Sequence, residues 1–257
     1  QAATAASPTS TLAPAAPKSA ALSAAKRKPA AAENPAPIAG KPIIEYILAK
    51  VEELDEVDEI FIVTNNKFFN NFRNWKRTYS STKPIKIIND KTENEEDRLG
   101  AIGDIDFVAK QEGINEATLI IAGDNLFNFS LNNLQKFFKE KNASVIALYD
   151  IQDKNLAAGK YGIAEIDKNN RIINFEEKPE NPKTTLVSTA CYIFSKEDAQ
   201  ELERCIEEHQ KPDNFGDFIK WLSKRKYVYG FVFNGKLFDI GNQEQIKEAD
   251  IVWSSKK

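Results

Sequence analysis

Residues 118–127 read TLIIAGDNLF, an apolar run that ends in Gly123-Asp124-Asn125. The run is short and rich in β-branched residues, which favours a buried strand. Gly, Asp and Asn favour a turn directly after it. A carboxylate at this point lies at the carboxyl end of a strand, where open α/β sheets bind their ligands. Asp124 is therefore a candidate ligand of a hard cation such as Mg²⁺, and a plain strand-to-loop turn is the alternative.

Strand and helix patterns alternate on both sides of this run. The elements expected up to residue 149 are, in chain order, a helix over 42–54, a strand over 59–63, a helix over 67–79, a strand over 85–88, a helix over 96–112, the strand over 118–122, a helix near 130–141 and a strand over 144–149. Parallel strands need crossover connections, which helices usually supply. The order therefore predicts an α/β fold with a parallel sheet and helices on its faces.

The pattern changes after residue 160, where predicted strands follow one another directly. The expected elements are strands over 161–166, 171–177 and 185–194, helices near 196–208 and 214–224, strands over 227–233 and 236–239, and a last helix from about 242. This half of the chain is therefore predicted to be mixed α+β rather than a second wound sheet.

The composition limits the class of protein. The chain has 257 residues, with 35 Lys and Arg against 38 Asp and Glu, and 42% of its residues are hydrophobic. This length suffices for a sizeable core in one large or two small domains. The balanced charge excludes a polycation that grips nucleic acid, and no apolar run reaches the ~18 residues that span a membrane. Cys191 and Cys205 show no metal-binding or CxxC spacing, so a reducing, cytoplasmic location is expected.

The first 39 residues differ from the rest. They hold sixteen Ala and six Pro, with no Gly, no Val and no aromatic residue. Four basic residues against Glu33 give this segment a charge of +3 and leave −6 for the remainder. So few large apolar side chains predict little contribution to a core. We therefore expect the ordinary globular fold to begin at Gly40.

Two further strand ends carry charged side chains. Phe238-Asp239-Ile240-Gly241 places a carboxylate at a predicted strand end, and a surface turn is the alternative there. Two carboxylates can bracket a metal ion that carries a triphosphate, so Asp239 is a candidate partner of Asp124. Glu176-Glu177-Lys178-Pro179 closes another predicted strand. Its Lys can neutralise a phosphate while a Glu accepts hydroxyl protons, and a solvated charged strand end is the alternative.

Missing residues exclude several catalytic classes. His209 is the single histidine and lies in a charged predicted helix, which excludes His-based nucleophilic triads and His metal sites. Neither cysteine has a nearby base, so both are expected to be small buried residues. No GxxxxGK(S/T) motif is present, so the chain is not a P-loop enzyme.

Seven stretches of the chain occur in the order of a known family. They are PIAGKPIIEYIL (37–48), IFIVTNNKF (60–68), EDRLGAIGDI (96–105), LIIAGDNLF (119–127), KYGIAEID (160–167), FEEKPENPKTTLVSTACYIF (175–194) and GKLFDIGNQEQIKEA (235–249). With these motifs the chain resembles the sugar-phosphate nucleotidyltransferases, which include glucose-1-phosphate thymidylyltransferases. Each motif is modest, and the order of all seven across most of the chain is what makes the resemblance specific.

The resemblance implies a Rossmann-like, glycosyltransferase-A-type mixed sheet flanked by helices, with an added α+β sugar-binding part. The implied nucleotidyltransferase domain covers 40–257, with a nucleotide-binding part over about 40–155 and a sugar-binding part over about 156–257. The implied reaction is Mg²⁺-dependent: an oxygen of a sugar 1-phosphate attacks the α-phosphorus of a nucleoside triphosphate, and pyrophosphate leaves. The Mg²⁺ would be held by Asp124 and Asp239. The implied partners are these two substrates, without nucleic acid or membrane, and a homo-oligomer is compatible with the family.

The resemblance also implies roles for residues that bind the substrates. Glu177 would accept sugar hydroxyls, and Lys178 would contact the sugar phosphate. The backbone at Gly162 and the side chain of Thr189 would line the sugar pocket. Leu99-Gly100 would lie near the nucleoside.

One part of the family pattern is not recognisable. The family opens with a strand and a Gly-rich loop with an Arg, and the loop cradles the triphosphate through backbone N–H groups. Residues 1–39 lack Gly, so an atypical Ala/Pro-rich segment is predicted in place of that strand and loop. No catalytic Arg or Lys is assigned to the segment. Lys18 and Lys28 are the candidates to replace them, and solvated linker lysines are the alternative.

The unrecognised loop leaves more than one function open. The first is an active sugar-phosphate nucleotidyltransferase. The second is a catalytically inactive member that binds a nucleotide sugar or a partner subunit and acts as a regulatory module. The third is a cytidylyltransferase that activates a non-sugar phosphate such as phosphocholine.

Overall fold

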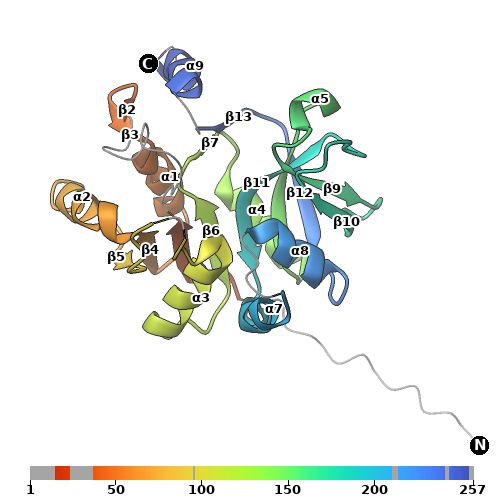
Figure 1. The fold of residues 1–257 in the computed structure, drawn as a ribbon, viewed down its shortest axis with the longest axis horizontal. Coiled ribbons are helices and arrows are strands. Elements are labelled where there is room, and N and C mark those ends of the chain that lie inside the picture. Colours follow the sequence, from red (N-terminus) through yellow and green to blue (C-terminus); the bar gives the residue numbers. More distant parts are fainter. Residues whose placement is uncertain (1–14, 24–36, 95, 210–213, 241–242, 255–257) are drawn as a thin grey trace, which may run out of the picture.

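The computed structural model of the chain describes residues 15–23, 37–94, 96–209, 214–240 and 243–254. In this part of the chain, a mixed sheet of nine strands occupies the centre of the molecule (Figure 1). Its strands are β1 (Ser19–Ser23), β4 (Glu59–Thr64), β5 (Ile85–Asn89), β6 (Thr118–Ala122), β8 (Val145–Asp150), β9 (Gly162–Ile166), β10 (Ile172–Glu177), β11 (Leu186–Phe194) and β12 (Tyr229–Phe233). The strand order is β10-β9-β11-β6-β1-β4-β5, and β8 pairs with β11 and β12.

Two short ladders and a set of helices complete the fold. The ladders pair β2 (Pro37–Ile38) with β3 (Lys41–Pro42), and β7 (Asn125–Phe127) with β13 (Leu237–Asp239). The helices are α1 (Ile43–Glu52), α2 (Asn66–Lys76), α3 (Gly100–Glu112), α4 (Leu131–Lys141), α5 (Lys154–Ala157), α6 (Lys196–Ala199), α7 (Glu201–His209), α8 (Phe215–Ser223) and α9 (Gln243–Ser254). In Figure 1, α9 lies beside the β2–β3 ladder, and the backbone N–H of Ala39 donates to Oδ1 of Asp250 at 2.6 Å.

The central strand of the main sheet comes from the Ala-rich opening of the chain. β1 pairs in parallel with β4 on one side and with β6 on the other. Its side chains alternate between the two faces: Ala20 and Leu22 belong to the core shared with α1, and Ala21 belongs to the core shared with α3. All three are at most 1% exposed. The opening therefore supplies a strand that is buried on both faces.

The prediction that residues 1–39 contain no first strand and little core is wrong for β1. A strand covered by helices on both faces does not need to alternate apolar and polar residues. The space between the sheet and its helices decides which side chains fit there, so large apolar side chains are not required. Short Ala side chains suit the close approach of helices from both sides. Residues 24–36, in which the family's loop was not recognised, lie outside the described residues.

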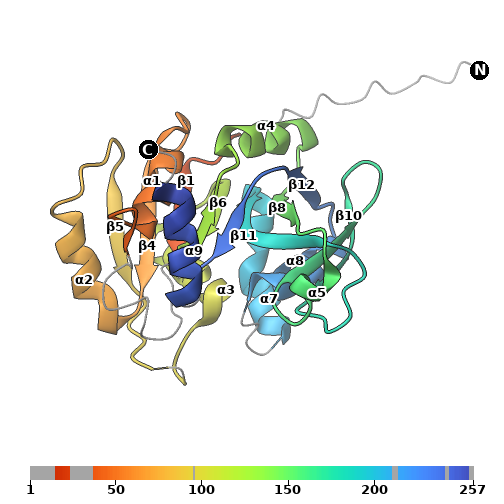
Figure 2. The ribbon, with the colours of Figure 1, turned by 90° about the horizontal axis from the view of Figure 1, so that it is seen from above.

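Helices cover the two faces of the sheet. α1, α2 and α4 pack on one face, with Ile47 and Leu134 in its core. α3, α7 and α8 pack on the other face, with Ile102 and Phe218 in its core. Figure 2 shows α4 on one side of the sheet and α7 and α8 on the opposite side. The result is the three-layer arrangement expected for an α/β fold.

β11 joins the two halves of the chain. It lies antiparallel between β6 and β8 and also pairs with β9. Its register against β8 shifts between Ser188 and Tyr192, and Ala190 in this bulge has a left-handed φ of 48°. The part of the chain after residue 156 therefore continues the same sheet as the part before it.

Local sequence explains several helix ends. The side chain of Asn65 caps α2 by accepting a hydrogen bond from the backbone N–H of Phe68 at 3.2 Å. Gly113, with φ of 68°, ends α3, and Asn142, with φ of 52°, ends α4. Gly and Asn are the residues that adopt this left-handed conformation most easily.

The helices and strands predicted after residue 40 are confirmed, with shifts of a few residues at their ends, except that the helix expected near 196–208 is divided at Gln200 into α6 and α7. The largest shift is in the helix expected over 96–112, which begins at Gly100. β2, β3, β7 and α5 were not predicted, because elements of two to four residues are too short to show a period.

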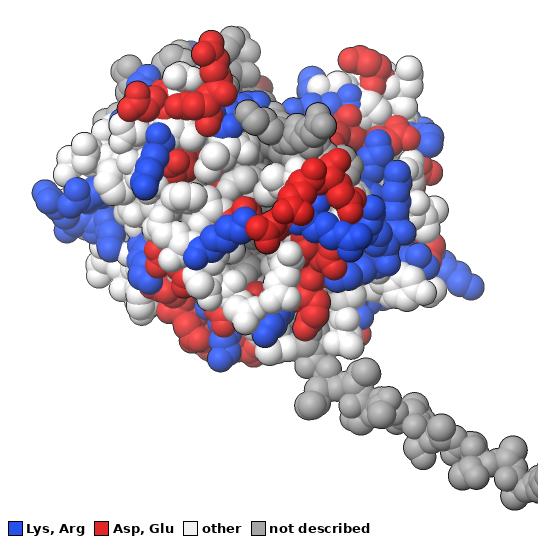
Figure 3. All heavy atoms as spheres, turned by 60° about the horizontal axis from the view of Figure 1, so that its bottom comes forward, with Lys and Arg blue, Asp and Glu red and all other residues white. Residues whose placement is uncertain are grey.

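Charges of both signs are interspersed on the surface. Figure 3 shows Lys and Arg side chains next to Asp and Glu side chains across the face in view. Lys110 is one case: its Nζ lies 2.9 Å from Asp106 and 2.8 Å from Glu203. In the described part of the chain, no helix has the length and apolarity required to cross a bilayer.

Candidate active site

The carboxyl ends of the parallel strands meet at one edge of the sheet. β1, β4 and β6 run in the same direction, with Ser23 in register with Val63 and with Ala122. Asp124 follows Ala122 by two positions and therefore lies at this edge. Ligands of open α/β sheets bind outside the carboxyl ends of the strands. This edge is where the chemistry of the protein is expected.

A short ladder brings Asp239 next to Asp124. β13 pairs antiparallel with β7, so that Asp239 lies opposite Asn125. The backbone N–H of Ile240 donates to the carbonyl of Asp124 at 2.9 Å. Both Asp residues are half-buried, and the two strands lie side by side at the top of Figure 1. Two Asp residues from distant parts of the sequence are therefore close along the backbone at the carboxyl edge.

The donors of this pair suit Mg²⁺. This ion usually takes one or two protein carboxylates and fills its other positions with water and phosphate oxygens. Among the residues that the structure describes, no group of three or more His, Cys, Asp or Glu side chains could hold a metal ion. An ion at Asp124 and Asp239 would thus need oxygen ligands from a substrate, as for a metal that binds together with a nucleoside triphosphate.

Asn125 connects the carboxylate pair to β11. Its side chain is 6% exposed, and its amide donates to the carbonyl of Thr189 at 2.7 Å. Thr189 itself is completely buried, and its hydroxyl donates to the carbonyl of Ala147 in β8 at 3.0 Å. The structure therefore gives the Thr189 hydroxyl a partner inside the sheet, and its contact with a sugar stays a prediction.

β9 and β10 bring Gly162 and Glu177 together. The two residues are paired in register. A Cβ on Gly162 would lie 2.9 Å from Oε2 of Glu177 and 2.6 Å from the ring of Phe175, closer than real Cβ atoms approach. Only glycine fits this close approach. The Glu177 carboxylate therefore lies directly over the backbone of Gly162.

Ser188 of β11 extends this row. β11 pairs with β9 at Val187 and Ile163, and continuing this antiparallel register by one residue places Ser188 opposite Gly162, on the side away from Glu177. Residues opposite each other in antiparallel strands have their side chains on the same face. The Ser188 hydroxyl lies 3.3 Å from that of Tyr192, whose pKa is raised by burial and further by the charge of Glu177. On the three neighbouring strands, Gly162 therefore lies between two polar side chains, those of Glu177 and Ser188.

Lys178 directly follows β10 and has a strained backbone conformation. Adjacent residues of a strand normally point to opposite faces. Lys178 has a left-handed φ of 46°, and its Nζ lies 3.9 Å from Oε1 of Glu177, with the Lys side chain 43% exposed. A left-handed conformation costs a non-glycine residue about 1–2 kcal/mol, and such strain is typical of functional sites. The backbone here brings an ammonium group and a carboxylate to the same side.

Two substitutions of Lys178 can distinguish the effect of its backbone strain on stability from the proposed effect of its charge on substrate binding. Lys178→Gly is expected to stabilise the fold by about 1 kcal/mol, because Gly adopts the left-handed conformation without strain and the exposed ion pair with Glu177 contributes little. It should also weaken binding of a sugar phosphate, because the cation is lost. Urea denaturation and the KM for sugar 1-phosphate measure the two effects.

Lys178→Ala is the matched control for this prediction. It removes the same charge and keeps the backbone strain, so it should weaken sugar-phosphate binding without the gain in stability. An equal stability gain in both variants would show that the left-handed backbone is not the cause. An unchanged KM in both would remove Lys178 from the phosphate site.

Leu99 and Gly100 reach the same edge by another route. β5 runs parallel to β4, so the chain leaves β5 at the carboxyl edge before it enters α3 at Gly100. Gly100 is buried with φ of 74°, and Leu99 is 38% exposed. A Cβ on Gly103 would lie 2.9 Å from Cβ of Leu99, so the first turn of this helix is closely packed. Their contact with a nucleoside stays a prediction.

Lys18 lies at the opposite edge. It precedes β1, and its carbonyl accepts a hydrogen bond at 2.7 Å from the backbone N–H of Asp58, just before β4 begins. At ~3.3 Å per residue, the five residues of β1 separate it from the carboxyl edge by about 16 Å. Lys18 as a substitute for a phosphate-binding residue is therefore wrong. Lys28, the second candidate, lies outside the described residues.

Gly216 is a residue of this region that the sequence reasoning missed. It lies buried in the first turn of α8, and a Cβ there would overlap Oε2 of Glu177. Glycine inside a helix costs roughly 0.5–1 kcal/mol relative to alanine. The glycine in the otherwise periodic stretch FGDFIKWLS was therefore the available sequence signal.

Comparisons with known proteins agree with this fold. Residues 22–252 match the family described as Nucleotidyl transferase. The chain is 30% identical over 217 residues to the Bifunctional protein GlmU of Methanocaldococcus jannaschii, a match that covers 83% of this chain and 47% of that protein. The chain thus spans about half the length of this curated relative.

Solved structures are similar across nearly the whole chain. A UDP-glucose pyrophosphorylase complexed with UDP-glucose has a TM-score of 0.77 at 20% identity, covering 94% of this chain and 100% of that one. A structure described as a glucose-1-phosphate thymidylyltransferase from Bacillus anthracis, in complex with a sucrose, has a TM-score of 0.72 at 20% identity, covering 93% and 96%. The predicted Rossmann-like mixed sheet flanked by helices is therefore confirmed.

Proposed function

Because the chain belongs to the nucleotidyl transferase family, we propose that it transfers a nucleoside monophosphate from a nucleoside triphosphate to a sugar 1-phosphate. The products are a nucleotide sugar and pyrophosphate. The observation that carries this proposal is the pairing of β7 with β13, through which Asp124 and Asp239 are neighbours at the carboxyl edge of the sheet. Family membership alone gives the reaction class, and this pair supplies the charge that the reaction needs.

Asp124 and Asp239 are the proposed ligands of Mg²⁺. Two half-buried carboxylates fit an ion whose other ligands come from water and a triphosphate. When bound, the ion would neutralise phosphate charge and help to orient the triphosphate. The buried amide of Asn125 holds the ladder that carries both Asp residues against β11.

Glu177 and Lys178 are the proposed contacts to the sugar phosphate. An ionised carboxylate accepts hydrogen bonds from several sugar hydroxyls, and an ammonium group pairs with a phosphate. Gly162 leaves the space over the sheet in which the Glu177 carboxylate lies. Leu99 and Gly100 at the start of α3, and Thr189 in β11, are proposed to bound the nucleoside and sugar sides of the site.

The reaction needs position more than a covalent catalyst. An oxygen of the sugar phosphate forms a bond to the α-phosphorus, the bond from that phosphorus to the bridging oxygen breaks, and pyrophosphate leaves with the electron pair. The attacking phosphate is an anion at neutral pH, so no general base has to activate it. Alignment of the two substrates and stabilisation of charge are then the main contributions of the protein.

A run of basic residues is proposed to supply further charge for the triphosphate. Lys26, Arg27 and Lys28 follow Ser23 by three to five positions in the sequence, and Ser23 is in register with Val63 and Ala122 at the carboxyl edge. Replacing all three by Ala should raise the KM for the nucleoside triphosphate at least about tenfold, since hydrogen bonds to charged groups contribute about 1.5–3 kcal/mol each.

Lys18→Ala is the matched control, because it removes one positive charge at the other end of β1. It should leave the KM for the nucleoside triphosphate unchanged. Equal effects of the triple and the control variants would indicate a general loss of positive charge. An unchanged KM in the triple variant would remove the basic run from the site.

Pyrophosphate release tests the proposed function directly. The purified protein is incubated with Mg²⁺, each nucleoside triphosphate in turn, and glucose 1-phosphate, other sugar phosphates or phosphocholine. Release that requires a sugar 1-phosphate supports the proposal. Release with phosphocholine alone would indicate a non-sugar acceptor, and nucleotide binding without turnover across the panel would indicate a regulatory module.

The proposed location is the cytoplasm. Cys191 and Cys205 are both buried and are not disulfide-bonded within the described residues, which suits a reducing compartment. A homo-oligomer is compatible with the proposal.

A further inference from the structure

We propose that Gly216 is a positioning residue for the acceptor substrate. Because it carries no side chain, the first turn of α8 can pack closely on β10 and confine the carboxylate of Glu177 between Gly216 and Gly162. This inference rests on the proposed function, since it takes Glu177 to bind the hydroxyls of the sugar phosphate. It adds a role for α8, a helix from which no site residue was predicted.

Oε2 of Glu177 occupies the space that a Cβ would need at both Gly162 and Gly216. A Cβ on Gly162 would lie 2.9 Å from Oε2 of Glu177, and a Cβ on Gly216 would overlap the same oxygen. The Cβ on Gly216 would also lie 2.9 Å from Cδ of Glu177. Both glycines are buried, while the Glu177 side chain is 22% exposed. The carboxylate is thus held between β9 and α8 with part of its surface exposed.

The start of α8 is also electrostatically suited to this contact. The side chain of Asn214 caps the helix by accepting from the backbone N–H of Asp217 at 3.2 Å. The first backbone N–H groups of a helix carry a partial positive charge that favours a nearby carboxylate. The start of α8 is therefore a favourable neighbour for the Glu177 carboxylate, whose oxygens accept hydrogen bonds from hydroxyl groups.

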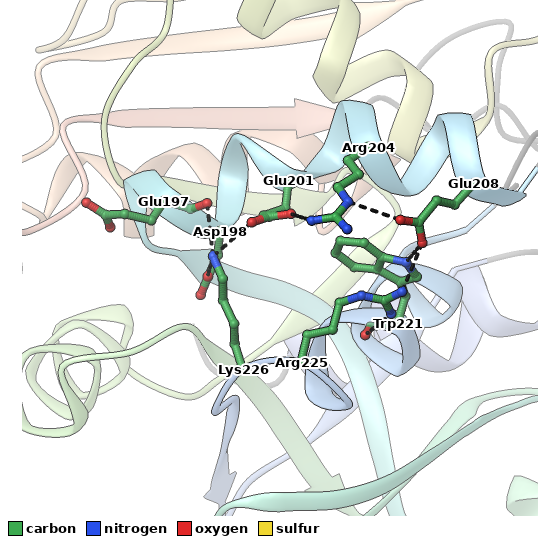
Figure 4. Close-up of polar contacts among 8 residues, drawn as sticks. All are labelled: Glu197, Asp198, Glu201, Arg204, Glu208, Trp221, Arg225 and Lys226. Atoms are coloured by element: carbon green, nitrogen blue, oxygen red, sulfur yellow. Dashed lines mark hydrogen bonds and ion pairs between the residues drawn. The ribbon is translucent and has the colours of Figure 1, made fainter.

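A cluster around Glu208 fixes α8 against α7 (Figure 4). Oε2 of Glu208 accepts from Nε1 of Trp221 at 2.6 Å and pairs with Arg225 at 2.9 Å. Arg204 pairs with the other carboxylate oxygen at 3.0 Å, and the Arg225 guanidinium lies 4.1 Å from the centre of the Trp221 ring. Trp221 is only 3% exposed. This cluster holds α8 against α7, so the flexible Glu177 side chain that faces the first turn is expected to move to relieve a clash there.

Gly216→Ala is therefore expected to act on the acceptor and not on the nucleotide. The KM for glucose 1-phosphate should rise about tenfold and that for the nucleoside triphosphate less than about twofold, because a displacement of ~1 Å is enough to impair a positioned contact. Pyrophosphate release measures both. Ser223→Ala, at the exposed end of α8, is the matched control and should change neither value.

The midpoint of urea denaturation distinguishes two explanations of the Gly216→Ala effect: displacement of the Glu177 carboxylate, or a general loss of stability in α8. Gly216→Ala should lower the urea midpoint in the wild-type background and in the Glu177→Gln background, because the Glu and Gln side chains at position 177 fill the same space. In the Glu177→Ala background it should raise the midpoint, because alanine is the better helix former and, of the three nearest atoms, only Oδ1 of Asn214 at 3.0 Å still lies close to the new Cβ. Such a reversal of sign measures the coupling of the two positions.

The outcomes distinguish this inference from the proposed function. A drop in midpoint of the same size in all three backgrounds, or an unchanged acceptor KM in folded Gly216→Ala protein, would overturn the inference. Gly216→Ala protein that folds only together with Glu177→Ala supports it. The urea readout needs no turnover, so a wild-type protein that releases no pyrophosphate defeats the proposed function while the reversal still decides the role of Gly216.

Discussion

Asp124→Asn should lower kcat about 10³-fold, because charge stabilisation at a metal contributes several kcal/mol and each ~1.4 kcal/mol is a factor of ten. Asn has nearly the same volume as Asp but no negative charge, so it should bind Mg²⁺ poorly. The backbone of Asp124 keeps its bond from Ile240 in the variant, since a carbonyl rather than the side chain accepts it. The fold should therefore be retained.

Three measurements check this result. Pyrophosphate release gives kcat, urea denaturation gives the stability, and titration with Mn²⁺ in the presence of a nucleoside triphosphate reports metal affinity without turnover. Asp55→Asn is the matched control, because Asp55 is exposed in the turn that precedes β4, at the opposite edge of the sheet. Wild-type turnover in Asp124→Asn would remove Asp124 from the metal site. An equal loss in Asp55→Asn would indicate a long-range effect of charge.

Helices, strands and site residues could be predicted from the sequence where a hydrophobic period or a strand end marked them. The apolar runs of β4 and β6 and the helical face of α1 are long enough to show their periods, so they were predicted. The rule that ligands bind at the carboxyl ends of strands led to Asp124. The same rule gave Asp239 as its candidate partner, but the pairing of β7 with β13 that brings the two together was not predicted, because strands of three residues show no period of their own.

Other features depend on packing that no single segment encodes. The left-handed backbone of Lys178 is imposed by the turn that follows β10, where its N–H donates to the carbonyl of Tyr161 at 3.1 Å, so propensity could not reveal it. The contact between Gly216 and Glu177 is a contact between α8 and β10, which lie far apart in the sequence. Sequence alone shows an unusual glycine there but not the side chain that needs its space.

β1 shows the limit of reading a segment by its own hydrophobicity. The segment was discounted because it is rich in Ala and poor in large apolar side chains. In the structure its neighbours supply the large side chains: Ala21 packs in one core with Ile102 of α3 and Ile120 of β6. A central strand gains its stability from ladders on both sides and from the layers above and below, which the strand's own composition does not report.

Leu22→Ala tests this assignment and should destabilise the fold by about 3 kcal/mol, since truncating a fully buried Leu loses transfer free energy and leaves a cavity. Leu22 is 0% exposed and packs in the core that includes α1. Helices on both sides of the sheet limit how far the cavity can collapse. The free energy of unfolding from urea denaturation measures the effect.

Leu156→Ala is the control for the same change at the surface, because Leu156 in α5 is 52% exposed. It should cost less than about 0.5 kcal/mol, as surface substitutions usually do. If Leu22→Ala cost no more than this control, β1 would not be the central strand. If the predicted loss appears, it supports Ser23 as the end of a central strand in register with Val63 and Ala122. The KM of the triple Ala variant of the basic run, which follows Ser23 by three to five positions in the sequence, is then the more informative measurement.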